Sequence, residues 1–421
     1  MIPNQWYPIA RTKDLRKKKP TGMTRLGERL VAWRDIDGNA VVQSARCPHK
    51  GADLGAGRIN RNAVECPYHG FRFGPDGACT AVPCLGRDAH IPKSLRIFNY
   101  PVRERHDLVW MWWGERRAEA DLPDLDVPPE ITRWKGVHIT GSWSQPVHYT
   151  RYIESMLEFY HAPWVHRGSW FNYLDYMFLY GTARKLGLDG RQRYFEACRV
   201  TNHRTEVDAD GTTLRSSFEL GREDDPDSGE PLKIVFTFPG TVHVINRKFD
   251  ITMWLTPIDD DHTQVLFRWY EAESLAPYLR SRTLRAAAPG IALGMQRWIG
   301  ERQDMRVVLG QEPKISQRGE SRFVAADEMN ARYLSIRAKL IQQAHRDAAP
   351  AGPVPAEPAG DPAAHVAPAD PAPSNGAAHR EAAANGSGVA RRGTAAKRRA
   401  AAPGGTARRN TVPAGVERDA G

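Results

Sequence analysis

Cysteine is scarce in this sequence, with five residues in a chain of 421. Cys47 and Cys66 stand close to histidines, and Cys79, Cys84 and Cys198 show no spacing that suggests disulfide pairs. Small secreted scaffolds are rich in disulfides, so this class is excluded and a reducing cytosol is the expected setting.

Long apolar runs are also absent. The longest, LVWMWW at Leu108–Trp113, is far shorter than the roughly 20 apolar residues of a membrane helix. The N-terminal segment MIPNQWYPIARTKDLRKKKP lacks the apolar core of a secretory signal. We therefore expect neither a membrane span nor a leader, and we predict a buried strand at Leu108–Trp113.

Aromatic residues are missing from positions 346–421, which consist mainly of Ala, Pro, Gly and charged residues. Such a composition cannot bury a core, so we predict a disordered tail. The tail carries part of the net charge of +10. Without interleaved aromatics the basic residues do not favour nucleic-acid binding, although a basic surface can steer an acidic protein partner.

The sequence has no glycine-rich dinucleotide fingerprint and no flavin motif. Nicotinamide chemistry would therefore need a separate protein. We also find no internal repeat, and the 41% hydrophobic content is enough for a real core.

Two short motifs place thiols and imidazoles close together. Cys47 and His49 are separated by one residue, and Cys66 and His69 by two. A [2Fe–2S] cluster uses this set asymmetrically, with two Cys on one iron and two His on the other. Zinc is the alternative, but structural zinc sites favour Cys-x-x-Cys spacing. Chance is the other alternative.

Glycines follow these motifs at Gly51, Gly55 and Gly70. They fit tight turns, and we expect their backbone N–H groups to point at the sulfides of the cluster.

A helix is predicted over Val147–His161, because apolar residues recur there with helical spacing. Glu154, Glu158 and His161 would share one face of this helix. Pro163 ends it, and His166 follows in a loop.

His161 and His166 could supply two corners of a 2-His-1-carboxylate site for non-haem Fe(II), the arrangement that activates O₂. The carboxylate must come from elsewhere in the chain. Spacing alone does not choose among Asp250, Glu301 and Asp304.

Around these motifs the chain resembles the large α subunit of Rieske non-haem iron oxygenases, over roughly residues 4–345. The segment from Glu154 to His166 is similar to the family's iron-binding segment. The segment Glu301–Gln311 is similar to the one that supplies the third ligand. The resemblance therefore implies that His161, His166 and Asp304 bind the mononuclear iron.

Glu158 matches the family's bridging carboxylate, which joins a cluster His of one subunit to an iron-bound His of its neighbour. Most members have Asp there, and relatives that oxidise quaternary ammonium compounds have Glu. The resemblance implies that Glu158 connects His69 of a neighbouring copy to His161 and that electrons follow this route. Respiratory Rieske proteins carry two further cysteines, and Ala52 and Tyr68 occupy those positions here, so an oxygenase-type cluster is implied.

The implied fold is α+β. It comprises a small Rieske β domain at residues 1–115, a linker at 116–131, a helix-grip catalytic domain with a large antiparallel sheet at 132–345, and the tail at 346–421. The pattern itself predicts strands or hairpins at 25–33, 40–44, 71–73, 78–82, 95–102, 232–238, 249–256 and 263–270, and helices at 278–310 and 328–345.

The resemblance implies an O₂-dependent oxygenase arranged as a head-to-tail homotrimer. It would receive NAD(P)H electrons through a flavin-containing reductase, with or without a ferredoxin. Hydroxylation or dealkylation of a bulky, aromatic or natural-product-like substrate is the favoured reaction. The alternatives are a ring-dihydroxylating dioxygenase, a quaternary-ammonium monooxygenase and, from a different class, a simple electron-transfer Rieske protein.

Overall fold

The computed structural model describes residues 1–347, except 17, 89, 126, 129–130, 132–137, 166–198, 223–224, 247–249, 271–282, 284–289, 291–292, 295–296 and 299. The predicted tail lies outside these residues, apart from its first two positions. So do His166, Cys198 and about half of the predicted helix at 278–310. Among the described helices, none is long and apolar enough to cross a membrane.

The N-terminal part contains three small antiparallel sheets. One has the order β1 (Gln5–Arg11), β11 (Leu108–Trp113), β10 (Val102–Arg105). The second has β2 (Thr21–Arg25), β3 (Glu28–Arg34), β4 (Ala40–Ser44) and β9 (Asn99–Tyr100). The third has β5 (Arg58–Ile59), β6 (Val64–Glu65), β7 (Arg72–Phe73) and β8 (Cys79–Ala81). Short 3-10 helices lie at Thr12–Asp14 (η1), Leu54–Ala56 (η2), Pro83–Leu85 (η3) and Glu119–Asp121 (η4).

The predicted buried strand is confirmed as β11, the central strand of its sheet, with five of its six side chains buried. The strands predicted at 25–33 and 40–44 pair as a hairpin, and so do those predicted at 71–73 and 78–82. One boundary is wrong. The strand predicted at 25–33 is split, because Leu26 and Gly27 adopt positive φ and turn β2 into β3.

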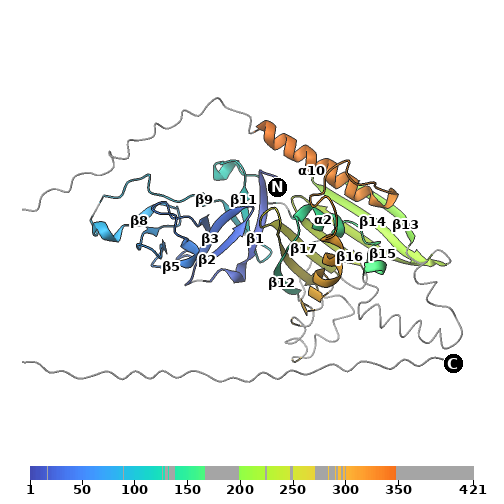
Figure 1. Ribbon diagram of the computed structural model, residues 1–421, viewed down its shortest axis with the longest axis horizontal. Helices are drawn as coiled ribbons and strands as arrows, with labels where there is room; N and C mark the ends of the chain where they lie inside the picture. The colour runs from blue at the N-terminus through green and yellow to red at the C-terminus, as the bar shows by residue number, and fades with distance from the viewer. Residues whose placement is uncertain are drawn as a thin grey trace, which may run out of the picture. The chain divides into compact units, whose positions relative to one another are not determined.

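The C-terminal part is built on a seven-stranded antiparallel sheet (Figure 1). Its order is β12 (His138–Gln145), β18 (Thr263–Tyr270), β17 (Asp250–Pro257), β16 (Thr241–Asn246), β15 (Asp225–Thr237), β14 (Thr213–Arg222), β13 (Arg199–Val207). The helical elements are α2 (Tyr149–Met156), α3 (Ala162–Val165), the π-helix η6 (Gly300–Asp304), α9 (Met305–Val308), η7 (Ala325–Asp327) and α10 (Glu328–Asp347).

The two faces of this sheet differ because side chains alternate along a strand. Val244, Met253 and Phe267 belong to a core shared with α2, α9 and α10. The intervening residues, such as Trp254 and Leu266, pack instead against the N-terminal part. The large antiparallel sheet expected from the sequence is therefore confirmed, with helices on one face.

The N-terminal part packs directly on the sheet. Leu26 N–H donates to Pro257 O at 2.7 Å, and Thr256 Oγ1 donates to Pro8 O at 2.7 Å. Leu122 and Leu125, from the predicted linker, are buried in the same shared core. Residues 1–352 form one unit of contacts, and the domain boundaries proposed from the sequence stay a prediction.

One helix is shorter than predicted. The pattern favoured a single helix over Val147–His161, but α2 ends at Met156 and α3 begins only at Ala162. The intervening residues form a turn in which the Glu158 side chain accepts a hydrogen bond from the His161 N–H at 3.1 Å. A side chain that binds the backbone in this way competes with helix continuation.

Candidate metal centres

The two Cys/His motifs occupy two loops with matching backbone geometry. Cys47 N–H donates to Ala52 O, and Cys66 N–H donates to Phe71 O, at 2.9 and 2.7 Å. Each loop is closed by a glycine with φ near +70°, Gly51 in one and Gly70 in the other. Both loops are therefore tight turns, as the sequence indicates.

The predicted direction of the glycine N–H groups is wrong. Gly51 N–H donates to Cys47 O and Gly70 N–H to Cys66 O, at 2.8 and 3.1 Å. Gly55 N–H donates to the side chain of Asp53. The N–H groups of Gly51 and Gly70 hold the two turns closed, and glycine is favoured at these two positions because their positive φ disfavours other residues.

The four side chains form two unlike pairs. Cys47 and Cys66 are 2% and 3% exposed, whereas His49 and His69 lie at the surface. The two imidazole rings are 4.7 Å apart between centroids, and His49 stacks on Phe71. Thiols inside and imidazoles outside match the unequal ligation of a cluster with two Cys on one iron and two His on the other.

The thiols are in contact and are not oxidised to a disulfide. Burial, together with a smaller effect of the adjacent Cys66, raises the pKa of Cys47 to about 11. Partial desolvation, with smaller effects of His49 and Lys50, lowers the pKa of His69 and favours the neutral ring that can bind a metal. A buried thiol with a raised pKa ionises when a metal cation binds it, so these residues fit an iron–sulfur cluster.

In the described part of the chain, no group of three or more His, Cys, Asp or Glu side chains is arranged to hold one metal ion. The cluster loops do not require such a group, because each iron takes two protein ligands. The second centre is incomplete in this respect, because His166 lies outside the described residues.

The second centre lies where the turn after α2 approaches η6. His161 Nδ1 is 2.7 Å from Glu158 Oε1, and His161 Nε2 is 3.8 Å from Asp304 Oδ1. Glu158, His161 and Asp304 line one cavity of about 250 Å³. Two atoms that each bind a metal at about 2 Å lie no more than about 4 Å apart, so His161 and Asp304 fit one ion.

The electrostatics of His161 are set by its carboxylate neighbours. Burial lowers its pKa, but the hydrogen bond and charge of Glu158 and the charge of Asp304 outweigh burial and raise the pKa overall. With Nδ1 bonded to Glu158, Nε2 faces Asp304 and is the nitrogen placed for a metal.

The other carboxylates considered for the third ligand behave differently. Asp250 contacts His243 at 2.6 Å on the sheet, and both side chains are buried. The backbone of Glu301 lies in η6 with Asp304. π-helical turns are rare and are frequent at functional sites.

Sequence analysis missed three residues of the same cavity. Arg151 donates to Glu154 Oε2 at 2.7 Å and to Pro313 O at 2.8 and 2.6 Å. Tyr160 donates to Asp327, which stands directly before α10. The Arg151–Glu154 spacing could have predicted an ion pair, but nothing in the sequence indicated Asp327.

Comparison with known proteins assigns residues 5–101 to the family described as the Rieske [2Fe–2S] domain. The chain is 35% identical over 123 residues to a 3-chlorobenzoate-3,4-dioxygenase oxygenase subunit of Comamonas testosteroni, covering 29% of this chain and 28% of that protein. It is 33% identical over 171 residues to a putative toluene-4-sulfonate monooxygenase iron–sulfur subunit of the same species, covering 39% and 46%. These matches span less than half of either relative.

The fold is similar to a crystal structure of dicamba monooxygenase bound to dicamba. The TM-score is 0.58 at 19% sequence identity, and the match covers 82% of this chain and 99% of the other. At that identity the likeness concerns the fold alone, but it extends through both the N-terminal part and the seven-stranded sheet.

Proposed function

We propose that this chain is a catalytic α subunit of the Rieske non-haem iron oxygenases and that it oxygenates an organic substrate with O₂. The main support is that two separate candidate iron centres occur in one chain, the paired loops at Cys47–His69 and the His161–Asp304 pair. When bound, the cluster would supply single electrons and the mononuclear iron would activate O₂.

In this proposal the side chains of the protein bind the two metal centres, and Glu158 orients one of the metal-binding side chains. Cys47, His49, Cys66 and His69 bind the cluster, and His161, His166 and Asp304 bind the iron. Glu158 fixes the ring of His161 through Nδ1 and leaves Nε2 for the metal.

Glu158 is also proposed to bridge two subunits. Both of its oxygens already accept hydrogen bonds from His161, but each carboxylate oxygen has a second lone pair. The exposed ring of His69 from a neighbouring copy could donate to it. In Figure 1 the strands beside the cluster loops, β5 and β8, lie on the side of the N-terminal sheets away from α2, which supports transfer between subunits in a head-to-tail homotrimer.

Electrons would come from NAD(P)H through a separate reductase, with or without a ferredoxin, since the sequence has no nucleotide-binding fingerprint. The four described cysteines are free thiols, which suits a cytoplasmic enzyme.

For the substrate we propose a bulky aromatic or natural-product-like molecule, with monooxygenation favoured. The two relatives are named for a dioxygenase and a monooxygenase, so ring dihydroxylation is the second candidate.

Asp304→Ala tests the proposal. Among candidate aromatic compounds, those that accelerate O₂-dependent reoxidation of the reduced, iron-loaded wild-type protein identify the substrate class. In Asp304→Ala this acceleration should disappear, while the visible spectrum of the cluster stays intact. Substrate turnover that survives the substitution would refute the iron site. A simple electron carrier would show no compound-dependent acceleration in either protein.

A further inference from the structure

A second cavity, of about 360 Å³, lies between the N-terminal part and the seven-stranded sheet. The end of β1, η1 and the start of β11 form one wall, and β12, β17 and β18 form the other. Trp254 and Leu266 line it and lie on the sheet face opposite α2 and α9. The cavity is therefore separate from the candidate iron centre, and its volume is in the range of small-molecule sites.

Two buried N–H groups of this lining have no acceptor among the described residues. They are Trp254 Nε1 and Arg268 Nε, on side chains that are 1% and 4% exposed. Nη2 of the same Arg268 guanidinium donates to His106 O and to Asp107, and its Cζ lies 5.6 Å from the Trp254 ring centroid. Buried donors without acceptors are costly, so a ligand that accepts hydrogen bonds would stabilise this site.

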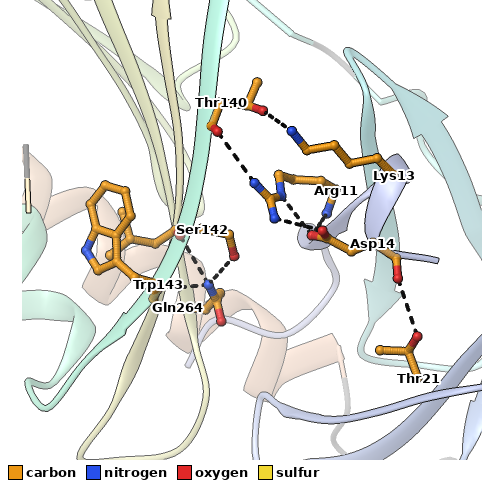
Figure 2. Close-up of polar contacts among 9 residues, drawn as sticks. Arg11, Lys13, Asp14, Thr21, Thr140, Ser142, Trp143 and Gln264 are labelled. Atoms are coloured by element: carbon orange, nitrogen blue, oxygen red, sulfur yellow. Dashed lines mark hydrogen bonds and ion pairs between the residues drawn. The ribbon is translucent and has the colours of Figure 1, made fainter. Parts of the chain in front are cut away.

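Among the cations that line the cavity, one has no carboxylate partner in the described part of the chain. Arg11 is bound to Asp14 at 2.7 Å and Arg268 to Asp107 at 3.1 Å. Lys13 has no carboxylate partner in the described part of the chain, and its ammonium donates to Thr140 Oγ1 at 2.9 Å. Figure 2 shows Arg11 and Lys13 reaching from the N-terminal part towards Thr140 on β12.

We propose that this junction cavity binds a small organic carboxylate. The single negative charge matches the one uncompensated cation, Lys13. The carboxylate oxygens would accept from the unpartnered donors of Trp254 and Arg268, and the organic body would contact Leu108 and Leu266. Because both walls contribute, occupancy would hold the N-terminal part against the sheet.

Titration calorimetry of the full-length, metal-loaded protein with benzoate tests this site. We expect saturable binding of one benzoate per chain and a Kd about tenfold higher for benzamide, the neutral analogue. Lys13→Ala should raise the benzoate Kd about fivefold. Trp254→Phe keeps the aromatic ring, removes the indole N–H and should have a similar effect.

Two controls distinguish binding in this cavity from non-specific attraction to surface cations and from binding at the proposed iron centre. Lys19→Ala removes an exposed cation of the same segment that does not line the cavity, and its benzoate Kd should equal that of the wild type. Asp304→Ala, which disables the proposed iron centre, should also leave the Kd unchanged. The proposal is overturned if benzoate does not bind, if Lys13→Ala and Trp254→Phe bind it as tightly as the wild type, or if Asp304→Ala abolishes binding.

Discussion

At the scale of single residues, the pair Glu158–His161 determines how pH acts on the proposed iron site. A protonated imidazole cannot bind a metal, and Glu158 raises the pKa of His161. Affinity for Fe(II) should therefore be full above this pKa and fall about tenfold per pH unit below it. In Glu158→Gln the fall should begin at lower pH, which Fe(II) titrations between about pH 5 and 8 would measure. An onset at the same pH in both proteins would contradict this account.

His148 leads to a prediction on stability. Burial, followed by the charge of Arg337, lowers its pKa to about 4, and its unprotonated Nδ1 accepts the Thr150 N–H at the start of α2. The unfolded chain takes up this proton near pH 6.5, so stability should fall as pH drops from about 6.5 towards 4. The loss by about pH 5 should be about 1 to 2 kcal/mol after allowance for solvent screening.

His148→Asn isolates this effect, because Asn also caps helices but does not titrate. Unfolding free energies measured by urea titration at about pH 7 and pH 5 should differ less in this variant than in the wild type. Equal differences in the two proteins would assign the acid sensitivity to other groups.

At the scale of elements, α2 is held to the segment after α9 by buried polar contacts. Arg151 bonds Glu154 and Pro313 O, and Ser316 N–H donates to Thr150 Oγ1 at 3.0 Å. These contacts join the segment that follows Asp304 and α9 to the helix that precedes His161. The two candidate ligands are thus positioned by the same anchor.

Arg151→Met should destabilise the protein by about 3 kcal/mol, because it leaves the buried Glu154 carboxylate without its cation. The matched control is Arg332→Met. The wild-type pair of Arg332 with Glu328 is about 40% exposed, so its loss should lower the free energy of unfolding by less than about 0.5 kcal/mol. Urea unfolding midpoints compare the two variants. Similar small effects in both would show that the anchor does not stabilise this region.

Elements with a clear repeat were predictable from the sequence. The strands at 263–270 and 108–113 match β18 and β11, and the helix at 328–345 matches α10 to within two residues. The helix over Val147–His161 was overextended, because its apolar spacing continues past Met156 and gives no sign that Glu158 binds the backbone. Local periodicity does not show side-chain contacts of this kind.

The residues of the two candidate centres were predictable to different extents, because only one centre is built from residues close together in the sequence. The cluster loops are local, so spacing alone placed Cys47, His49, Cys66 and His69. Asp304 approaches His161 only through the tertiary fold, and spacing could not prefer it to Asp250. The family resemblance made that choice, and the structure places Asp304 near His161 and Asp250 beside His243.

At the scale of the whole molecule, the N-terminal part with the candidate cluster loops and the part with the second candidate centre are joined through an extensive shared core. Trp6, Trp110 and Trp112 of the N-terminal part share this core with Trp254 and Leu266 of the sheet. A protein that only carried electrons would not need the sheet. The central claim is therefore that one chain holds two different iron centres.

Iron and acid-labile sulfide counts test that claim most directly. Purified, reconstituted wild-type protein should contain about three iron atoms and two sulfides per chain. Asp304→Ala should retain about two of each, and Cys47→Ala should lose the sulfide and keep about one iron. A wild-type value of two irons that Asp304→Ala does not change, or zinc in place of iron, would contradict the account.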